Sequence, residues 1–292
     1  MRRAGRALPP LLLLWAHGAA ALCMSSVPPP VVLEPQTSVP SPAFLEALVL
    51  ERGEHYAVLN KPPSIPCHAL EYKSKDAPTP LLQLGRDALQ ERINLVHRLD
   101  RGASGCVLCA FERDGPAPTT ALHTALGGAT KTYVALVRGE GLIGGEDLKH
   151  KGWFTVDREI KDARGRVNDA TTLFKFVCSS EEPRASLVLA RPATGRWHQI
   201  RRHLNGLSHP ILGDTTHGSS HTNREWRERG MPPERIGLHL ARIQLPATEH
   251  SPPIDVRCPL PEDLLRLLRE QLPDVLEQAR DVLREEANLE FD

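Results

Sequence analysis

The middle of the chain is divided into short apolar runs, and this pattern limits the folds it can adopt more than any other feature. Short apolar runs bounded by turn residues predict β-strands. The run 131–137 alternates and contains β-branched residues, and an Arg-Gly-Glu turn at 52–54 joins the first two runs into a hairpin. The predicted strands are 48–50, 56–59, 93–95, 107–111, 131–137, 173–177 and 187–189.

Helical spacing of apolar residues occurs in three other places. Residues 78–92 and 197–204 each suit one helix, and 262–292 carries a stripe that is interrupted at Pro273. Proline breaks a helix interior, so two terminal helices are expected there. Strands outnumber helices and the two are mixed along the chain, which indicates an α+β fold with a largely antiparallel sheet.

The N-terminal segment differs from the rest of the chain. Three arginines precede the apolar run 11–22, and the first acidic residue is Glu34. Twelve apolar residues are too few to span a bilayer but fit the core of a signal peptide. A Pro-rich stretch follows and is typical of a linker. We therefore expect residues 1–43 to be a targeting segment with a linker, or else a disordered N-terminus, and ordered structure to begin near Phe44.

The formal net charge is zero, but the charges are unevenly distributed. Residues 262–292 hold ten acidic and four basic side chains, so the other 261 residues carry +6. Residues 184–242 contain ten arginines against four acidic residues, with six histidines besides. We expect an Arg-rich face and a detached acidic tail, which is compatible with RNA binding.

The cysteines are scattered and predict no disulfide framework. Cys106 and Cys109 have the spacing of half a zinc site, but they lie in an apolar run with no second pair nearby. Core cysteines are the better interpretation. His217 and His221 lie in a Gly/Ser stretch that suits a loop better than a metal site. No metal is expected.

The segment 97–105 places one carboxylate, Asp100, between Arg98 and Arg101 in a turn with two glycines. Flanking cations favour the ionised carboxylate. Glycines allow a bulky substrate to approach a loop closely. Taken alone, this pattern also suits a surface turn with ion pairs.

The same nine residues resemble the signature HRLDRxTSG of the RluA-type pseudouridine synthases, with Ala103 where threonine is usual. Other family motifs follow in order, and the likeness covers about 46–250. Residues 201–204, 214–218 and 223–224 are most similar to the TruC branch, which acts on tRNA. The further matching segments are 59–63 (with Pro63-Ser64 departing from the pattern), 131–139, 194–204 and 209–214.

The resemblance implies an enzyme that isomerises uridine in RNA to pseudouridine, with tRNA favoured over rRNA. The uracil leaves C1′ of its ribose, turns and reattaches through C5, so the atoms are conserved and no cofactor is needed. The implied fold is a pseudouridine synthase domain at 44–260 with a mixed, largely antiparallel bent sheet flanked by helices. An acidic helical extension would occupy 261–292.

The resemblance also implies roles for individual residues. Asp100 matches the catalytic aspartate, which could attack C1′, stabilise its charge or remove a ribose proton. Tyr133 matches the tyrosine placed against the flipped base, and Arg201 the basic residue that pairs with the aspartate. Arg98 matches the arginine that fills the space left by the base. The phosphate contacts assigned more loosely are Arg101 and Arg202, and the histidines expected to be structural are His97, His198 and His203.

Two alternatives remain open at this point. One is an RNA-binding or folding module that has lost catalysis, and the other is a secreted protein, which fits poorly with unpaired cysteines. An RNA substrate and a signal-like start are reconciled if 1–43 directs the protein to an organelle, with a plastid favoured and a mitochondrion as the alternative. We expect a monomer without stable membrane association after processing.

Overall fold

The structure is a computed structural model that describes residues 40–69 and 77–289. Nearly all of the predicted targeting segment 1–43 lies outside the described residues. The first element, helix α1 (Pro42–Ala47), begins at Ser41, whose hydroxyl accepts a hydrogen bond from the Phe44 amide at 3.2 Å. Within the described ranges no helix is long and apolar enough to cross a membrane.

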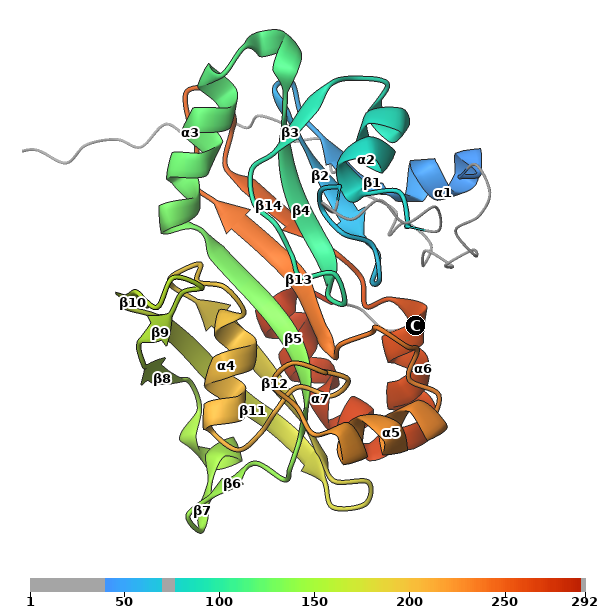
Figure 1. The fold of residues 1–292 in the computed structure, drawn as a ribbon, viewed down its shortest axis with the longest axis vertical. Coiled ribbons are helices and arrows are strands. Elements are labelled where there is room, and N and C mark those ends of the chain that lie inside the picture. Colours follow the sequence, from blue (N-terminus) through green and yellow to red (C-terminus); the bar gives the residue numbers. More distant parts are fainter. Residues whose placement is uncertain (1–39, 70–76, 290–292) are drawn as a thin grey trace, which may run out of the picture.

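One ten-stranded sheet forms the body of the molecule (Figure 1). Eight strands follow the order β1-β2-β4-β13-β5-β12-β11-β8, with β3 paired to β4 and β14 paired to β13. The strands of this sheet are β1 (Val49–Arg52), β2 (Tyr56–Lys61), β3 (Ile93–Leu95), β4 (Ser104–Phe111), β5 (Thr130–Arg138), β8 (Phe154–Asp157), β11 (Thr171–Ser180), β12 (Ala185–Pro192), β13 (Leu238–Leu245) and β14 (Ile254–Arg257). All the predicted strands are present.

The pairings confirm the expected mixed, largely antiparallel sheet. Within the described part of this sheet, β4 and β13 form the single parallel pair, in which Ser104 faces His239. Two separate two-stranded hairpins lie outside the sheet. They consist of β6 (Leu142–Ile143) with β7 (Glu146–Asp147), and β9 (Ile160–Lys161) with β10 (Val167–Asn168).

Alternation along the strands gives the sheet two apolar faces. In β5, Tyr133 and Ala135 belong to one core cluster, whereas Val134 and Leu136 belong to the other. The first cluster is covered by helices α2, α3 and α4, and the second by α5, α6 and α7. In Figure 1, α7 passes behind the sheet and α5 and α6 lie beside it. These helices are α2 (Leu81–Leu89), α3 (Ala117–Ala125), α4 (Gln199–Gly206), α5 (Ser220–Glu228), α6 (Glu262–Gln271) and α7 (Pro273–Ala287), and three short 3-10 helices occupy Glu112–Asp114, Leu126–Gly128 and Leu148–Lys151.

The C-terminal helices pack on the body, so the expectation of a detached acidic tail was wrong. Helix α7 begins at Pro273, where the apolar stripe is interrupted. Its Glu286 accepts hydrogen bonds from Trp153 at 3.1 Å and from Lys175 and Arg191 at 2.9 Å. Apolar side chains of both helices are buried in the second cluster. Part of the acidic charge therefore neutralises cations of the body.

Candidate active site

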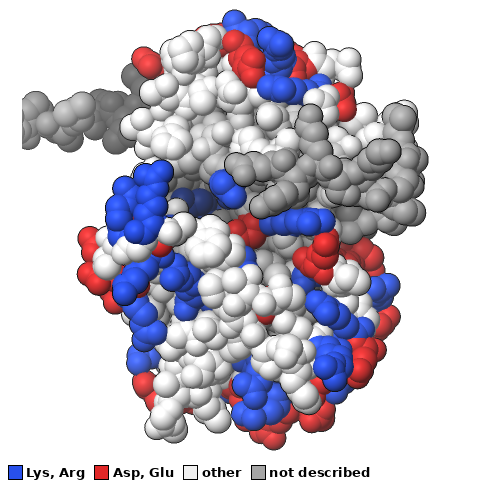
Figure 2. Space-filling model, in the orientation of Figure 1, with Lys and Arg blue, Asp and Glu red and all other residues white. Residues whose placement is uncertain are grey.

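A pocket of about 820 Å³ opens on the face of the sheet that carries α4. Its walls are the turn 95–100 and helix α3 on one side and residues 192–201 on the other, with β5 between them. Figure 2 shows this face hollowed, with Lys and Arg side chains inside the hollow and along its edge. The pocket brings together Arg98, Asp100, Tyr133 and Arg201, four of the six predicted site residues.

Asp100 begins the turn 100–103 before β4, and 26% of its side chain is exposed. Arg201 donates a hydrogen bond from Nη1 to Asp100 Oδ2 at 2.9 Å. The His198 Nε2 atom lies 3.8 Å from Asp100 Oδ1. The predicted pairing of the carboxylate with Arg201 is therefore present in the structure.

Arg201 is itself held by a second carboxylate. It is buried, and its Nε and Nη2 donate to the two oxygens of Asp214, both at 2.7 Å. Burial opposes a charged guanidinium, but the hydrogen bonds and charges of Asp214 and Asp100 raise the pKa of Arg201 above its ordinary value. A bidentate pair fixes the plane of a guanidinium. The remaining N–H is thereby directed at Asp100.

The fully buried Asp214 was given no role by sequence reasoning, although it ends the matching segment 209–214. Burial would raise its pKa, but the Arg201 hydrogen bonds and the backbone amides of His217 and Thr216 lower it below the ordinary value. Asn223 in α5 donates to the Asp214 carbonyl and accepts from the Gly213 amide. The signal that could have found Asp214 is its charge inside a family motif.

Histidines line the wall next to Asp100. His198 Nδ1 lies 3.0 Å from His217 Nε2, and the Trp197 ring stacks on the His198 ring with centroids 3.9 Å apart. Burial lowers the pKa of His198 to about 4, so the imidazole is neutral at neutral pH. His217 belongs to the turn before α5, whereas His221 lies within that helix rather than in the expected loop.

The other two histidines that were expected to be structural, His97 and His203, differ in their relation to the pocket. His97 lines it, and its Nε2 accepts a hydrogen bond from the Leu108 amide. His203 lies in the core, where its ring contacts Thr172 Oγ1 and the Arg158 carbonyl. Its place there suits a structural residue.

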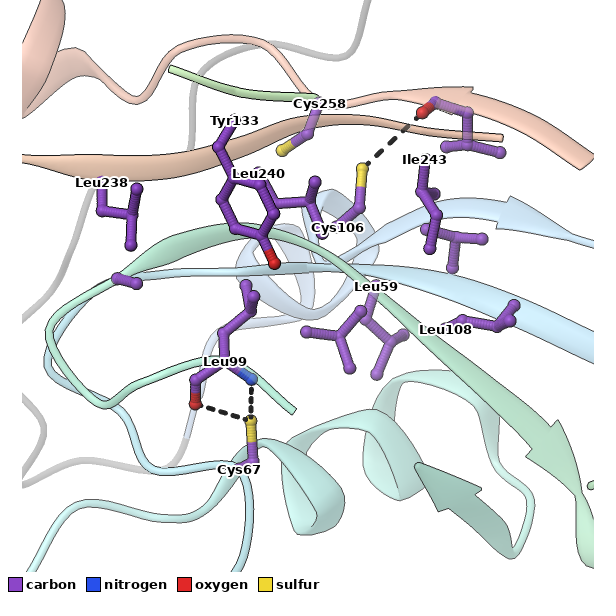
Figure 3. Close-up of a cluster of buried hydrophobic side chains, with 14 of the residues drawn as sticks. Leu59, Cys67, Leu99, Cys106, Leu108, Tyr133, Leu238, Leu240, Ile243 and Cys258 are labelled. Carbon is purple, nitrogen blue, oxygen red and sulfur yellow. Dashed lines mark hydrogen bonds between the residues drawn. The ribbon is translucent and has the colours of Figure 1, made fainter. Parts of the chain in front are cut away.

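Tyr133 extends from β5 to the pocket floor, and only 9% of it is exposed. Figure 3 shows its ring beside Leu240, with the hydroxyl directed toward the turn at Leu99. Burial and the nearby Asp100 charge raise the pKa of the hydroxyl well above its ordinary value. The tyrosine therefore presents a neutral aromatic ring beside the carboxylate.

Two buried side chains hold the turn from below. Lys61 donates from Nζ to the carbonyls of Pro62, Arg101 and Ala103 at 2.7 to 3.0 Å, and burial lowers its pKa to about 7. Three acceptors favour the ammonium form, which has three N–H donors. The Cys67 thiol lies between the Leu99 amide and carbonyl (Figure 3). Sequence reasoning gave neither residue a role.

Arg235 holds the same turn from the core. It donates from Nη1 to the Gly102 carbonyl and from Nη2 to Ser104 Oγ, both at 2.9 Å, while its Nε lies 2.9 Å from Asp263 Oδ2 in α6. Ser104 Oγ is in turn 2.9 Å from His239 Nδ1. This fully buried arginine was also missed, because its partners are distant in sequence.

The two glycines of the segment 97–105, Gly102 in the turn and Gly105 in β4, serve the fold rather than the expected approach of a bulky substrate. A Cβ at Gly102 would lie 2.4 Å from the Glu234 carbonyl oxygen, and a Cβ at Gly105 would lie 2.3 Å from that of Leu240. Gly105 also has φ +118°, which side chains rarely adopt. The glycines are required because the chain before and within β13 passes against the turn.

The remaining predicted phosphate contacts lie outside the pocket lining. Arg101 pairs with Glu234 at 2.8 Å and donates to the Ser64 carbonyl, and Arg202 donates to the Lys161 carbonyl at 2.8 Å. Arg98 lines the pocket and is exposed, and no hydrogen bond or ion pair joins it to another described residue.

The arginines of 184–242 were expected to form an Arg-rich face. Six of the ten pair with carboxylates, and two of these six, Arg201 and Arg235, are buried. Much of the charge of this segment is therefore neutralised locally. The six pairs are Arg184–Glu140, Arg191–Glu286, Arg201–Asp214, Arg229–Glu182, Arg235–Asp263 and Arg242–Asp255.

The prediction of core cysteines is confirmed. Cys106 and Cys109 are fully buried in β4, and the Cys109 thiol donates to the Ala57 carbonyl at 3.3 Å. The described residues contain no group of three or more His, Cys, Asp or Glu side chains that could hold a metal ion.

Comparisons with known proteins point to one family. The family model for RNA pseudouridylate synthase matches residues 55–206. The chain is 30% identical over 208 residues to tRNA pseudouridine synthase C of Vibrio vulnificus, covering 67% of this chain and 83% of that protein. It is also 30% identical over 253 residues to ribosomal large subunit pseudouridine synthase C of Escherichia coli K12, covering 83% and 77%. The solved structure of human RNA pseudouridylate synthase domain containing 4 has a similar fold, with a TM-score of 0.58, 23% identity and coverage of 80% and 96%.

Proposed function

The chain belongs to the RNA pseudouridylate synthase family and is an RNA uridine isomerase, and from this premise we propose that Asp100 is its reacting carboxylate. The observation that carries the proposal is the hydrogen bond of 2.9 Å from buried Arg201 to a carboxylate that faces the pocket. Breaking the N1–C1′ bond leaves an electron-poor C1′. A carboxylate fixed in this position can attack C1′, stabilise its charge or remove a ribose proton.

Tyr133 and Arg98 handle the base in this proposal. The neutral ring of Tyr133 lies on the pocket floor, where it can stack on a uracil that has left its helix. Arg98 is exposed at the edge of the pocket and extends toward the RNA, where it fills the space that the uracil vacates. His198, neutral at neutral pH, leaves the charge of Asp100 to be balanced by Arg201.

The test is Asp100→Asn, which keeps the size of the side chain and removes its charge. We expect the variant to bind RNA and melt like the wild type, yet to form no pseudouridine in a tritium-release or mass-spectrometric assay. Retention of even about a tenth of wild-type turnover, one decade or about 1.4 kcal/mol, would contradict the role of Asp100.

A second pair of variants tests Tyr133. Tyr133→Phe keeps the aromatic face and should retain most activity, whereas Tyr133→Leu should lose the stacking energy of about 1–3 kcal/mol per base. Equal turnover in the two variants would exclude stacking as the role of this ring.

We favour tRNA over rRNA as the substrate. Support comes from the segments 201–204, 214–218 and 223–224, which are most similar to the TruC branch. Relatives named for tRNA and for ribosomal RNA are both 30% identical, so the preference rests on these segments. Mapping pseudouridines in tRNA and rRNA from cells with and without the gene tests it, and a site lost only from rRNA would reverse it.

We also propose that residues 1–43 direct the protein to an organelle, most simply a plastid. The support is the acid-free start with three arginines and the apolar run 11–22. A fluorescent protein fused behind these residues should collect in the organelle. Diffuse cytosolic fluorescence would refute the proposal, and a mitochondrial pattern would select the alternative address.

A further inference from the structure

Trp197 is a large apolar side chain in an unusual place. It is 55% exposed, although aromatic residues make up only 4% of the chain. The other large hydrophobic residues exposed in the described part of the chain, Leu142 and Val167, lie on the two small hairpins, whereas Trp197 lines the pocket. An exposed indole that lines a pocket offers an aromatic face to a molecule that enters the pocket.

The indole is held in place before any ligand arrives. It stacks on the His198 ring with an interplanar angle of 23°, and it meets the His217 ring edge to face at 6.2 Å between centroids. These two histidines lie 3.0 Å apart, from Nδ1 to Nε2. A ring that is already oriented loses little conformational freedom when it binds.

The indole is also close to the reacting group and to a cation. His198, on which it stacks, lies 3.8 Å from Asp100. The Arg202 guanidinium lies 5.9 Å from the centre of the Trp197 ring and is anchored to the Lys161 carbonyl. An aromatic face with an arginine beside it suits an unpaired nucleotide, because the base can stack while the phosphate meets the cation.

We propose that Trp197 is a stacking platform for an unpaired nucleobase next to the target uridine, with Arg202 beside it for a phosphate of the same strand. The proposal rests on the proposed function, because it requires a uridine in the pocket. The segment 194–204 resembles the family motif TGRxHQLRxHL, and its two open positions are occupied here by Trp197 and Arg202. The platform would therefore add a contact that helps this enzyme select its RNA.

Binding measurements in the Asp100→Asn background separate stacking from catalysis. The probe is an RNA hairpin that contains the uridine converted by the wild type. Trp197→Ala should weaken binding about 10- to 100-fold, whereas Trp197→Phe should stay within about threefold. Leu142→Ala, which removes an equally exposed side chain from the β6–β7 hairpin, should leave binding unchanged. Equal affinity of the Ala and Phe variants would overturn the proposal.

Abasic RNAs identify the base. The hairpin is made with one abasic nucleotide at each position flanking the uridine in turn. At one position the abasic RNA should bind more weakly to the protein with Trp197, and Trp197→Ala should then add no further loss. A Trp197→Ala effect that persists on every abasic RNA would mean that no base stacks on the indole.

Fluorescence gives a readout that does not depend on turnover. Stacking on a base should quench the indole, so RNA-dependent quenching should vanish in Trp197→Phe and persist in Trp153→Phe. Quenching that persists without Trp197 would contradict the platform. If the wild type converts no uridine in any RNA, the proposed function fails instead, which keeps the two outcomes distinct.

Discussion

Two buried arginines, Arg201 and Arg235, hold the same turn from opposite sides. Arg201 reaches it from the pocket side and binds the side chain of Asp100. Arg235 reaches it from the core side and binds the backbone at Gly102 and the hydroxyl of Ser104. Each arginine also pairs with a carboxylate from a distant segment, Asp214 in one case and Asp263 in the other.

The two arginines differ in whether one of their hydrogen bonds ends on a group that faces the pocket. Arg201 directs one N–H at a carboxylate that faces the pocket, whereas every polar contact of Arg235 is made to groups of the fold. Burial and ion pairing alone therefore do not distinguish an arginine that holds a proposed site residue from one that holds only the fold. The exposure of the group that each arginine holds distinguishes the two.

The largest expected effect is on stability, through Arg235. Arg235→Met leaves the Asp263 carboxylate, the Gly102 carbonyl and the Ser104 hydroxyl without their partner, which should lower the free energy of unfolding by about 3–5 kcal/mol. Urea denaturation measures this free energy. The double variant Arg235→Met/Asp263→Leu should recover part of the loss. The folded fraction should keep turnover within about tenfold. An unchanged midpoint would mean that Arg235 does not hold the turn.

Arg201→Lys should act mainly on catalysis. Lysine keeps the charge but cannot bind both Asp214 oxygens and Asp100 in one fixed plane. Losing the charge-assisted bond to Asp100 should lower kcat by about 30- to 150-fold, or about 2–3 kcal/mol. Stability should fall less than in Arg235→Met. A variant with wild-type kcat and a large loss of stability would make the two arginines equivalent.

The stability of the core on the Arg235 side of the turn should also depend on pH, through His239. Its Nε2 donates to the Cys258 carbonyl and its Nδ1 faces Ser104, and burial lowers its pKa from 6.5 to about 3. As pH falls below about 6.5, the unfolded chain takes up a proton that the folded imidazole refuses, so stability falls by about 1.4 kcal/mol per pH unit.

Between about pH 6.5 and 5 the free energy of unfolding should fall by about 2 kcal/mol because of His239. His239→Gln has no titrating group and should show a correspondingly flatter dependence of unfolding free energy on pH. An identical slope in both proteins would exclude His239 as its source.

The smallest expected effect concerns RNA phosphates. Arg101 is exposed at the same turn and paired with Glu234, and we proposed it as a phosphate contact. Arg101→Gln should lower the slope of log binding constant against log salt by about 0.7–0.9. Arg235→Met should leave the slope unchanged, because the guanidinium is fully buried. An unaltered slope in Arg101→Gln would remove this contact.

Local patterns predicted the strands well but missed several elements. Strand β5 was evident because it alternates and faces a core on both sides. Strand β13 was not predicted, because polar His239 and Arg242 interrupt its apolar residues, and they are satisfied by Ser104 and Asp255 from other segments. The helices α1, α3 and α5 are short, and α3 contains Thr119 and Thr120, which are weak helix formers.

The residues of the site also divide into those that the sequence indicated and those that it did not. The resemblance of the motifs indicated Asp100, Tyr133, Arg98 and Arg201, and the structure brings these four to one pocket. Lys61 and Arg235 were missed because their roles consist of contacts with distant parts of the chain, and Asp214 was missed although its partner Arg201 lies 13 residues away. The excess positive charge of 184–242 overstated the free charge of this segment for a related reason, because the sequence does not show which carboxylates neutralise it.

The parallel pairing of β4 with β13 also affects the order in which the protein can form during synthesis. Ser104 and His239 are 135 residues apart, and Arg201 is 101 residues from Asp100. Pairings of such high contact order are slow to form. On the ribosome, β4 can pair with β2 and β3, but its end at Ser104 and Gly105 stays unpaired on one edge until β13 has emerged, and such edges invite aggregation. A nascent chain released just before β13 should therefore depend on chaperones, even though it already contains Asp100, Tyr133 and Arg201.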